Sequence, residues 1–199
     1  MFDKSTTIVA NTQHRIHRLP AGMMQGDLST EIFACRESKS VYALSDGKSI
    51  PFNQLNSKFR AQIFEKLLDD PKAIEDLKHL SAEDATEKFA FCIYGACDSN
   101  PDFCANGILK EADNFICSDS CTCLKWSSKN IKLNGNVLTS KEIQVIQLLA
   151  TDLSDKMIAD RLDITPSTLD THKAHLFEKA GVHSKNGLIV AAIDQKIIQ

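Results

Sequence analysis

The length, composition and charge of the chain exclude several classes of protein. At 199 residues it can hold one ordinary domain and a small one, and 43% hydrophobic with 25% charged residues is typical of a globular chain. No apolar run approaches the roughly 18 residues that a membrane span needs. The N-terminus lacks the apolar segment of a secretory signal, so we expect a cytoplasmic protein with no membrane partner. The net charge of −3 gives no general attraction to nucleic acid, so any DNA binding must depend on local geometry.

The first region, residues 1–91, is expected to contain a hairpin and helices. The runs 32–35 and 40–44 are short and rich in residues that favour strands, which predicts a hairpin. Apolar residues then recur at helical spacing from 53 to about 90, on both sides of Pro71. Ser81 is the expected N-cap of the last of these helices. We therefore expect a small α+β or mostly helical domain here.

The second region, residues 92–130, is rich in cysteine and is expected to be a loop segment that ends in a linker over 125–136. It holds six of the seven cysteines, among Gly, Asn and Pro residues, with little aliphatic core. A reducing compartment disfavours structural disulfides and favours metal binding. The alternative is that several of these cysteines are small buried apolar residues.

Three of these cysteines are close enough in sequence to share one ion, namely Cys117, Cys121 and Cys123. The fourth ligand could be Cys92, Cys97 or Cys104, and we favour Cys92 because it ends an expected helix and would tie that helix to the distal loop. Zinc, as a structural staple that replaces part of a core, is the favoured metal. An iron–sulfur cluster is the alternative and would make the protein a redox or iron sensor.

The third region, residues 138–199, has the capping signals of four helices. Thr139 and Glu142 fit a capping box, and Gly181 supplies a left-handed helix stop. The other expected N-caps are Ser154, Thr165 (followed by Pro166) and Ser184. The connection between the second and third helices is only a few residues long, which predicts a helix-turn-helix. Caps and spacing alone also allow a four-helix bundle for protein interaction.

The segment LTSKEIQVIQLLATDLSDKMIADRLDITPSTLDTHKAHLFEKAGVHSK resembles the C-terminal domain of LuxR/NarL/GerE-type bacterial transcription regulators. The matching elements are LT..E..V..LLA, LS.K.IA..L.I,.TL..H,..KAGV and SK. The resemblance implies a four-helix domain that binds double-stranded DNA, forms a homodimer through its fourth helix and controls transcription. The expected fold class is thus mainly α: this domain joined to a small N-terminal domain with a cysteine-rich, metal-bound segment. The N-terminal half resembles neither a phospho-receiver nor a lactone-binding domain.

The resemblance also implies which residues contact DNA and the partner subunit. Residues on or near the surface that reads base edges are Thr168, Asp170, Thr171, Ala174 and His175. Residues expected to contact phosphates are Lys156, Thr165, Ser167, Lys173, Lys179 and Lys185. Residues expected in the dimer contact are Leu188, Ile189 and Ala192. Asp170 and Ala174 depart from the family's usual basic or polar residues. Residues 138–199 carry seven Lys/Arg and eight Asp/Glu, so we expect DNA binding to need a dimer and to be sensitive to salt.

Two functions remain after this reading. The favoured function is a sequence-specific transcription regulator with a metal-stabilised N-terminal part. The alternative is a metal-binding adaptor that uses the helical domain for protein contacts, which would explain the acidic balance. We expect no enzyme, because the sequence shows neither a Cys-x-x-Cys beside a strand–helix unit, nor a phosphate-binding glycine loop, nor a His/Glu metallohydrolase motif.

Overall fold

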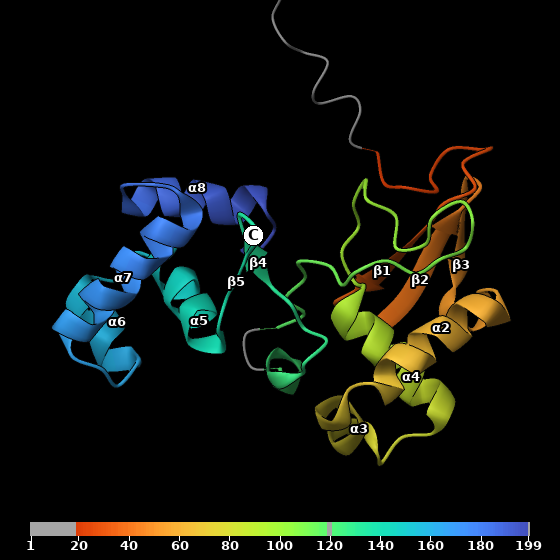
Figure 1. Ribbon diagram of the computed structural model, residues 1–199, viewed down its shortest axis with the longest axis horizontal. Coiled ribbons are helices and arrows are strands. Elements are labelled where there is room, and N and C mark those ends of the chain that lie inside the picture. Colours follow the sequence, from red (N-terminus) through yellow and green to blue (C-terminus); the bar gives the residue numbers. More distant parts are fainter. Residues whose placement is uncertain (1–18, 119–120, 199) are drawn as a thin grey trace, which may run out of the picture.

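The computed structural model describes residues 19–118 and 121–198. Two hydrophobic cores lie side by side, one in the N-terminal part and one in the C-terminal part of the chain (Figure 1). Among the described residues, no helix is long and apolar enough to cross a membrane. The expectation about a secretory signal falls on residues 1–18, which lie outside the described residues.

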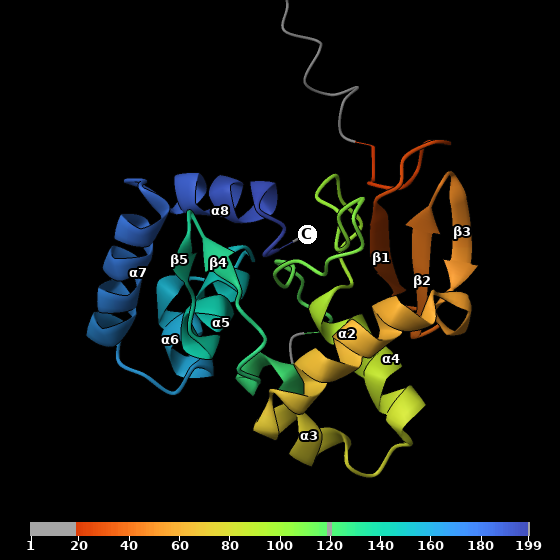
Figure 2. The same ribbon diagram turned by 45° about the vertical axis from the view of Figure 1, so that its right-hand side comes forward.

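A three-stranded antiparallel sheet with the order β1-β2-β3 opens the N-terminal part (Figure 2). The predicted hairpin is confirmed, and a third strand that we did not predict extends it. That strand is short and lacks apolar alternation, so its sequence gives no strand signal. It joins the hairpin through Asp46 and Gly47, both at positive φ, as a two-residue turn of this kind requires. The strands are β1 (Thr30–Cys35), β2 (Ser40–Ser45) and β3 (Lys48–Pro51).

Three helices follow in the stretch expected to be helical. Each begins after a residue whose side chain accepts a hydrogen bond from the first turn, namely Asn56, Asp70 and the predicted Ser81. Helix α4 packs against β1 and β2, and α2 packs against α4. The elements are a short 3₁₀ turn η1 (Phe52–Gln54), α2 (Ser57–Leu68), α3 (Pro71–Leu77) and α4 (Ala82–Ile93).

The cysteine-rich segment belongs to the same core as the sheet, so the boundary expected at residue 91 is not a boundary of the core. Phe103 pairs with Thr30 of β1, and the Asp102 carboxylate accepts a hydrogen bond from the backbone N–H of Ile32 at 2.7 Å. Cys123 and Trp126 are buried in the core that also holds β1 and α4. The change of composition at residue 92 marks a loss of regular structure rather than a new domain.

The stretch 125–136, expected to be a linker, is largely ordered, and this expectation was wrong. It contains most of a small hairpin whose turn is the predicted Asn134-Gly135, with φ of 49° and 80°. Ile131 and Leu133 are buried in the C-terminal core. The elements here are η2 (Thr122–Lys125), β4 (Lys132–Leu133) and β5 (Asn136–Val137).

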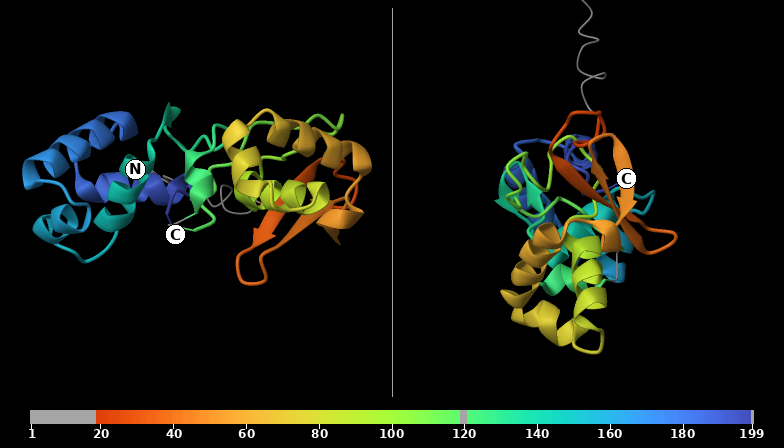
Figure 3. Two further views of the ribbon diagram at one scale, coloured as in Figure 1. Left: turned by 90° about the horizontal axis from the view of Figure 1, so that it is seen from below. Right: turned by 90° about the vertical axis from the view of Figure 1, so that its right-hand side faces the viewer.

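Four helices form the C-terminal part, which is coloured green-blue to blue in Figure 3. Each helix begins where its capping signal predicts. The capping box of Thr139 and Glu142 is present, and Gly181 ends the third helix in the left-handed conformation. The helices are α5 (Ser140–Leu149), α6 (Asp155–Arg161), α7 (Pro166–Ala180) and α8 (Lys185–Asp194).

The two parts contact each other through loops and the end of the chain. The amide of Asn114 donates to the carbonyl oxygens of Lys132 at 2.6 Å and Gln195 at 3.3 Å. The Lys196 ammonium, just after α8, lies 3.0 Å from the Asp98 carboxylate. The end of α8 is therefore held by the cysteine-rich segment of the N-terminal part.

Candidate metal centre and nucleic-acid interface

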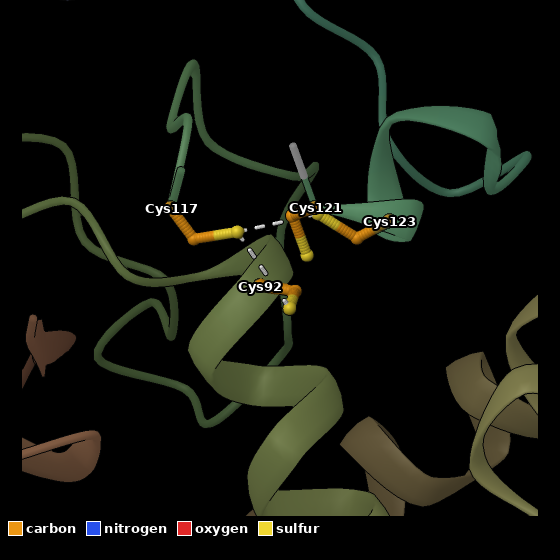
Figure 4. Close-up of side chains that lie close together, drawn as sticks. All are labelled: Cys92, Cys117, Cys121 and Cys123. Atoms are coloured by element: carbon orange, nitrogen blue, oxygen red, sulfur yellow. Dashed lines mark hydrogen bonds between the residues drawn. The ribbon is translucent and has the colours of Figure 1, made fainter. Parts of the chain in front are cut away.

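Four cysteine side chains converge where α4 ends, and they are the four expected from the sequence (Figure 4). Cys92 lies in the last turn of α4, Cys117 in the following loop, and Cys121 and Cys123 at the start of η2. All four sulfur atoms lie within 4.8 Å of one another. The sulfur of Cys117 is 3.3 Å from that of Cys123 and 4.0 Å from that of Cys92. The other cysteines lie outside this group, including Cys97 and Cys104, which were considered as the fourth ligand.

This geometry fits one thiophilic metal ion. Four thiolates around a tetrahedral Zn²⁺ with bonds of about 2.3 Å lie about 3.8 Å apart, between the two measured sulfur distances. In an iron–sulfur cluster, inorganic sulfide and more than one iron separate the cysteine sulfurs further. Three of the cysteines are buried and Cys121 is half-buried, so the group is shielded from solvent. The cysteine cluster could therefore hold a metal.

Lys129 places a positive charge beside this group, and sequence reasoning missed it. It is 7% exposed, donates to the carbonyl oxygen of Cys92 and lies 5.3 Å from the centre of the Phe115 ring. A buried ammonium stabilises neighbouring thiolates and the net negative charge of a four-thiolate metal site. One lysine in a lysine-rich stretch carries no signal of this placement in the sequence.

The four thiols also share hydrogen bonds, so they do not titrate alike. The pKa of Cys121 lies well below the ordinary value, because hydrogen bonds from Cys117, Cys123 and Cys92 stabilise its thiolate. The pKa of Cys92 is raised, because its hydrogen bonds with Cys117, Cys121 and Cys123 hold its proton in place. A thiolate in a shared group of this kind is ready to bind a metal ion.

In the C-terminal part, helices α6 and α7 form a helix-turn-helix. Residues 162–165 connect them, with Asp163 at a φ of 54° and the Ile164 N–H donating to the Ala159 carbonyl at 3.0 Å. Leu169 and Leu176 of α7 are fully buried and hold the helix against the core. The residues expected to read bases lie exposed along the outer side of α7, namely Thr168, Asp170, Thr171, Ala174 and His175.

Two of the lysines expected to contact phosphate are committed to ion pairs within the chain. The Lys173 ammonium lies 2.7 Å from Asp155 and 2.8 Å from Asp170, and hydrogen bonds to these two carboxylates raise its pKa. The Lys179 ammonium lies 2.8 Å from Glu142 and donates to the Val137 carbonyl at 3.0 Å. Both lysines therefore pair with carboxylates of their own chain, and their contact with phosphate stays a prediction. Lys173 also offsets the charge of Asp170, which sequence reading treated as an unfavourable feature of this surface.

The remaining residues expected to contact phosphates stay available on this side of the domain. Thr165 and Ser167 are exposed at the start of α7, and Thr165 also caps the helix. Lys156 is exposed and Lys185 is half-buried, and neither has an ion pair among the described residues.

The residues expected to form a dimer contact need correction. Leu188 and Ala192 are fully buried in the core of their own chain and Ile189 is half-buried. The apolar residues that α8 exposes are Val190, at 57%, and Ile193, at 51%. On α8, Val190 and Ile193 are therefore the large apolar side chains that are open to a contact outside the domain.

Comparison with known proteins finds similarity in the C-terminal third of the chain. The description "Bacterial regulatory proteins, luxR family" matches residues 136–192. Similar curated proteins include the oxygen regulatory protein NreC of Staphylococcus aureus strains JH9 and USA300, each 30% identical over 63 residues. This alignment covers 32% of the chain and 29% of each relative, so the chain spans less than a third of the length of these relatives. No solved structure matches the chain significantly. Residues 136–192 are a helix-turn-helix domain of the LuxR family.

Proposed function

We propose that the protein is a sequence-specific DNA-binding transcription regulator that reads DNA with α7 and carries one zinc ion on its four clustered cysteines. The observation that carries the first half is the pairing of a LuxR-family match with an exposed, polar outer face on α7. The observation that carries the second half is the convergence of Cys92, Cys117, Cys121 and Cys123.

The outer face of α7 offers groups that discriminate bases in the major groove. The Asp170 carboxylate can accept from the amino group of cytosine, and the Ala174 methyl can contact the methyl of thymine. Thr168 and Thr171 carry hydroxyls that donate and accept. Contacts to phosphate would come from Lys156, Thr165, Ser167 and Lys185, which position the helix without reading sequence.

Affinity would come from two copies of the domain rather than from one. Residues 138–199 carry a formal charge of −1, and Lys173 and Lys179 are engaged within the chain, so each domain gains little from counterion release. A homodimer joined through the exposed side of α8 presents two recognition helices and adds their binding energies.

Selection from a random DNA pool with the full chain tests the DNA-binding half. We expect enrichment of one sequence with two related half-sites. Thr171→Glu places a negative charge at the centre of the exposed face of α7 and should weaken binding to the selected site at least about tenfold. Gln54→Glu adds the same charge in the N-terminal part, where Gln54 is exposed, and should bind as the original chain does.

The alternative function, a metal-binding adaptor, predicts the opposite result. It is favoured by the acidic balance of the C-terminal domain. Under that function no sequence is enriched, and Thr171→Glu abolishes a contact with a protein partner instead. Enrichment that is unaffected by Thr171→Glu would show that α7 does not read the DNA.

Metal analysis with an absorption spectrum, on protein purified without oxygen, tests the metal. We expect about one zinc per chain and no visible absorption. Cys121→Ser should abolish binding, since it removes one of four thiolates, whereas Cys104→Ser, outside the group, should retain the full metal content. A brown protein that contains iron and sulfide would contradict zinc and favour the iron–sulfur alternative.

A further inference from the structure

A cavity of about 1440 Å³ opens at the junction of the two parts, apart from the cysteine cluster. One side is formed by the segments 97–102 and 109–114, and the other by the end of α8. Acidic side chains gather here: Asp98, Asp102 and Asp113 line the cavity, and Lys196 faces them from beyond α8. Glu31 of β1 is not part of the cavity wall, but repulsion from it helps to raise the pKa of Asp102.

Two of these carboxylates are fully buried, and only one of the two oxygens of each accepts a hydrogen bond. Glu31 is 0% exposed and Asp102 is 1% exposed. One oxygen of Glu31 accepts from the Asp98 N–H at 2.6 Å, and one oxygen of Asp102 accepts from the Ile32 N–H at 2.7 Å. Their other oxygens, Oε2 of Glu31 and Oδ1 of Asp102, have no hydrogen-bond partner among the described residues. A buried carboxylate oxygen without a donor or cation is strongly unfavourable.

Neighbouring negative charges make it still less favourable for these buried carboxylates to be ionised without a cation. Burial and then repulsion from Asp98 raise the pKa of Asp113 to about 7, although the Ala96 N–H, which donates to it at 3.0 Å, and the positive charge of Lys196 both act to lower it. Burial and the repulsion of Asp113 and Asp98 raise the pKa of Glu31 to about 9. Lys196 approaches Asp98 but leaves the two unpartnered oxygens unsatisfied. The site has an excess of negative charge and a shortage of positive charge.

We propose that this acidic cavity binds a hard divalent cation, Ca²⁺ or Mg²⁺, at Asp102, whose Oδ1 has no partner, with Asp98 and Asp113 beside it on the cavity wall. Both cations bind to oxygen ligands, and carboxylates are the usual ones in proteins. The loop that carries Asp98, Asn100 and Asp102 has the D-x-N-x-D spacing with which calcium-binding loops begin. It has Phe103 in place of the glycine of the EF-hand and Leu109 in place of its final glutamate, so the site is not an EF-hand.

The spacing of the carboxylates indicates how the cation is held. Among the described residues, the cysteines are the group of three or more ligand atoms that lie within 4.8 Å of one another. The carboxylates are more widely spaced, so one or two bind the cation directly and the others reach it through water, as is usual for Mg²⁺. The volume of the cavity leaves room for these waters.

The position of the site connects the cation to the DNA-binding part. Asp98 pairs with Lys196, and Asn114, which also lines the cavity, donates to the Gln195 carbonyl. A cation bound here competes with Lys196 for Asp98 and changes how the end of α8 is held. The cation is thus placed to alter the contact between the two parts.

Calorimetric titration of the zinc-loaded full chain with CaCl₂ and, separately, with MgCl₂ tests this site. We expect one binding event per chain for at least one of the two cations, and the two titrations show which is preferred. Asp102→Asn removes the carboxylate with the unpartnered oxygen on the cavity wall and should weaken binding at least about tenfold. Glu65→Gln makes the same chemical change at an exposed position of α2 and should leave the affinity unchanged.

Folding of the variant is checked by its zinc content and circular dichroism. If Asp102→Asn does not fold, Asp113→Asn, also on the wall of the cavity, replaces it with the same expected loss of affinity. The proposal is overturned if neither cation binds at millimolar concentration. It is also overturned if binding is equally tight in the folded variants, because the cation then lies elsewhere.

Discussion

Buried carboxylates in this protein behave differently according to the number of donors that each one meets. Asp70 is 0% exposed, and burial alone would raise its pKa, but hydrogen bonds from Ser128 and Ala73 lower it below the ordinary value. Its two oxygens both have partners, since one caps α3 and the other accepts from the Ser128 N–H at 2.7 Å. Glu31 is equally buried but has an unpartnered oxygen, and its pKa is raised. The donors, rather than the burial, decide which carboxylate is stable as an anion.

This difference predicts how stability depends on pH when no cation is bound. The pKa values of Glu31 and Asp113, about 9 and about 7 when folded, lie above those of the unfolded chain. Their contribution to stability is therefore full below the unfolded pKa and is lost as pH rises through 7 and then 9. We expect the thermal unfolding midpoint of the zinc-loaded chain, in buffer without divalent cations, to decrease as the pH is raised from about 6 to about 9.

Glu31→Gln should make this pH dependence shallower, because it removes a group whose folded pKa is about 9. The charged and titratable groups that act on Glu31 and Asp113 include Asp98, Asp102, Lys196, Lys129 and Cys97, and all remain in this variant. A midpoint that rises with pH over this range in the original chain would contradict the assignment. Saturating CaCl₂ or MgCl₂ should raise the midpoint most at the alkaline end, since the cation binds the deprotonated carboxylates.

At the scale of single elements, α8 has two apolar sides with different roles. Leu188 and Ala192 complete the core of the C-terminal domain, and Val190 and Ile193 are exposed. Exposed aliphatic side chains on a helix that already supports a core are suited to contact a second copy of the same helix. The family resemblance led us to expect the dimer contact at Leu188, Ile189 and Ala192, and helical periodicity alone does not show that the core occupies the side of Leu188 and Ala192.

We therefore predict that Ile193→Lys converts the protein from dimer to monomer without unfolding it. The mass in solution, from light scattering or sedimentation, measures the change, and circular dichroism confirms the fold. Val137→Lys is a matched control, because Val137 of β5 has the same exposed fraction of 51%. Leu188→Lys should unfold the domain instead, since it buries a charge in the core. A dimer that persists in Ile193→Lys would place the contact on another surface.

Local signals explain how much of the C-terminal domain was predictable. The N-caps Thr139, Ser154, Thr165 and Ser184 act within one helical turn, so the sequence shows them directly, and the helices begin there. The convergence of four cysteines was also expected, since three lie within seven residues. The ion pairs of Lys173 and Lys179 were not, because Asp155 and Glu142 lie on other helices and their approach depends on tertiary packing.

For the whole molecule, the segment around the cysteines connects two cores. Cys117 and Cys123 belong to the core of the sheet, whereas their chain neighbours Ile116 and Leu124 pack in or against the core of the C-terminal domain. The cation cavity lies at the same junction, opposite the end of α8. This arrangement could not be read from composition, which changes at residue 92 while the core continues. The long-range contacts of Glu31 and Asp102 across the sheet edge leave no pattern in the sequence.

The small hairpin before α5 decides where the DNA-binding part can be cut from the rest of the chain. Ile131 and Leu133 are buried in the core of the DNA-binding part. At the turn, the Asn134 side-chain amide donates a hydrogen bond to the Ala180 carbonyl at the end of α7, at 2.5 Å. Ile131, Leu133 and Asn134 lie upstream of residue 136, where the family match begins. A chimeric regulator that joins this DNA-binding domain to a foreign sensor domain must therefore include the chain from about residue 130 onward. A fusion made at the family boundary would remove Ile131 and Leu133 and leave a cavity in the core of the domain.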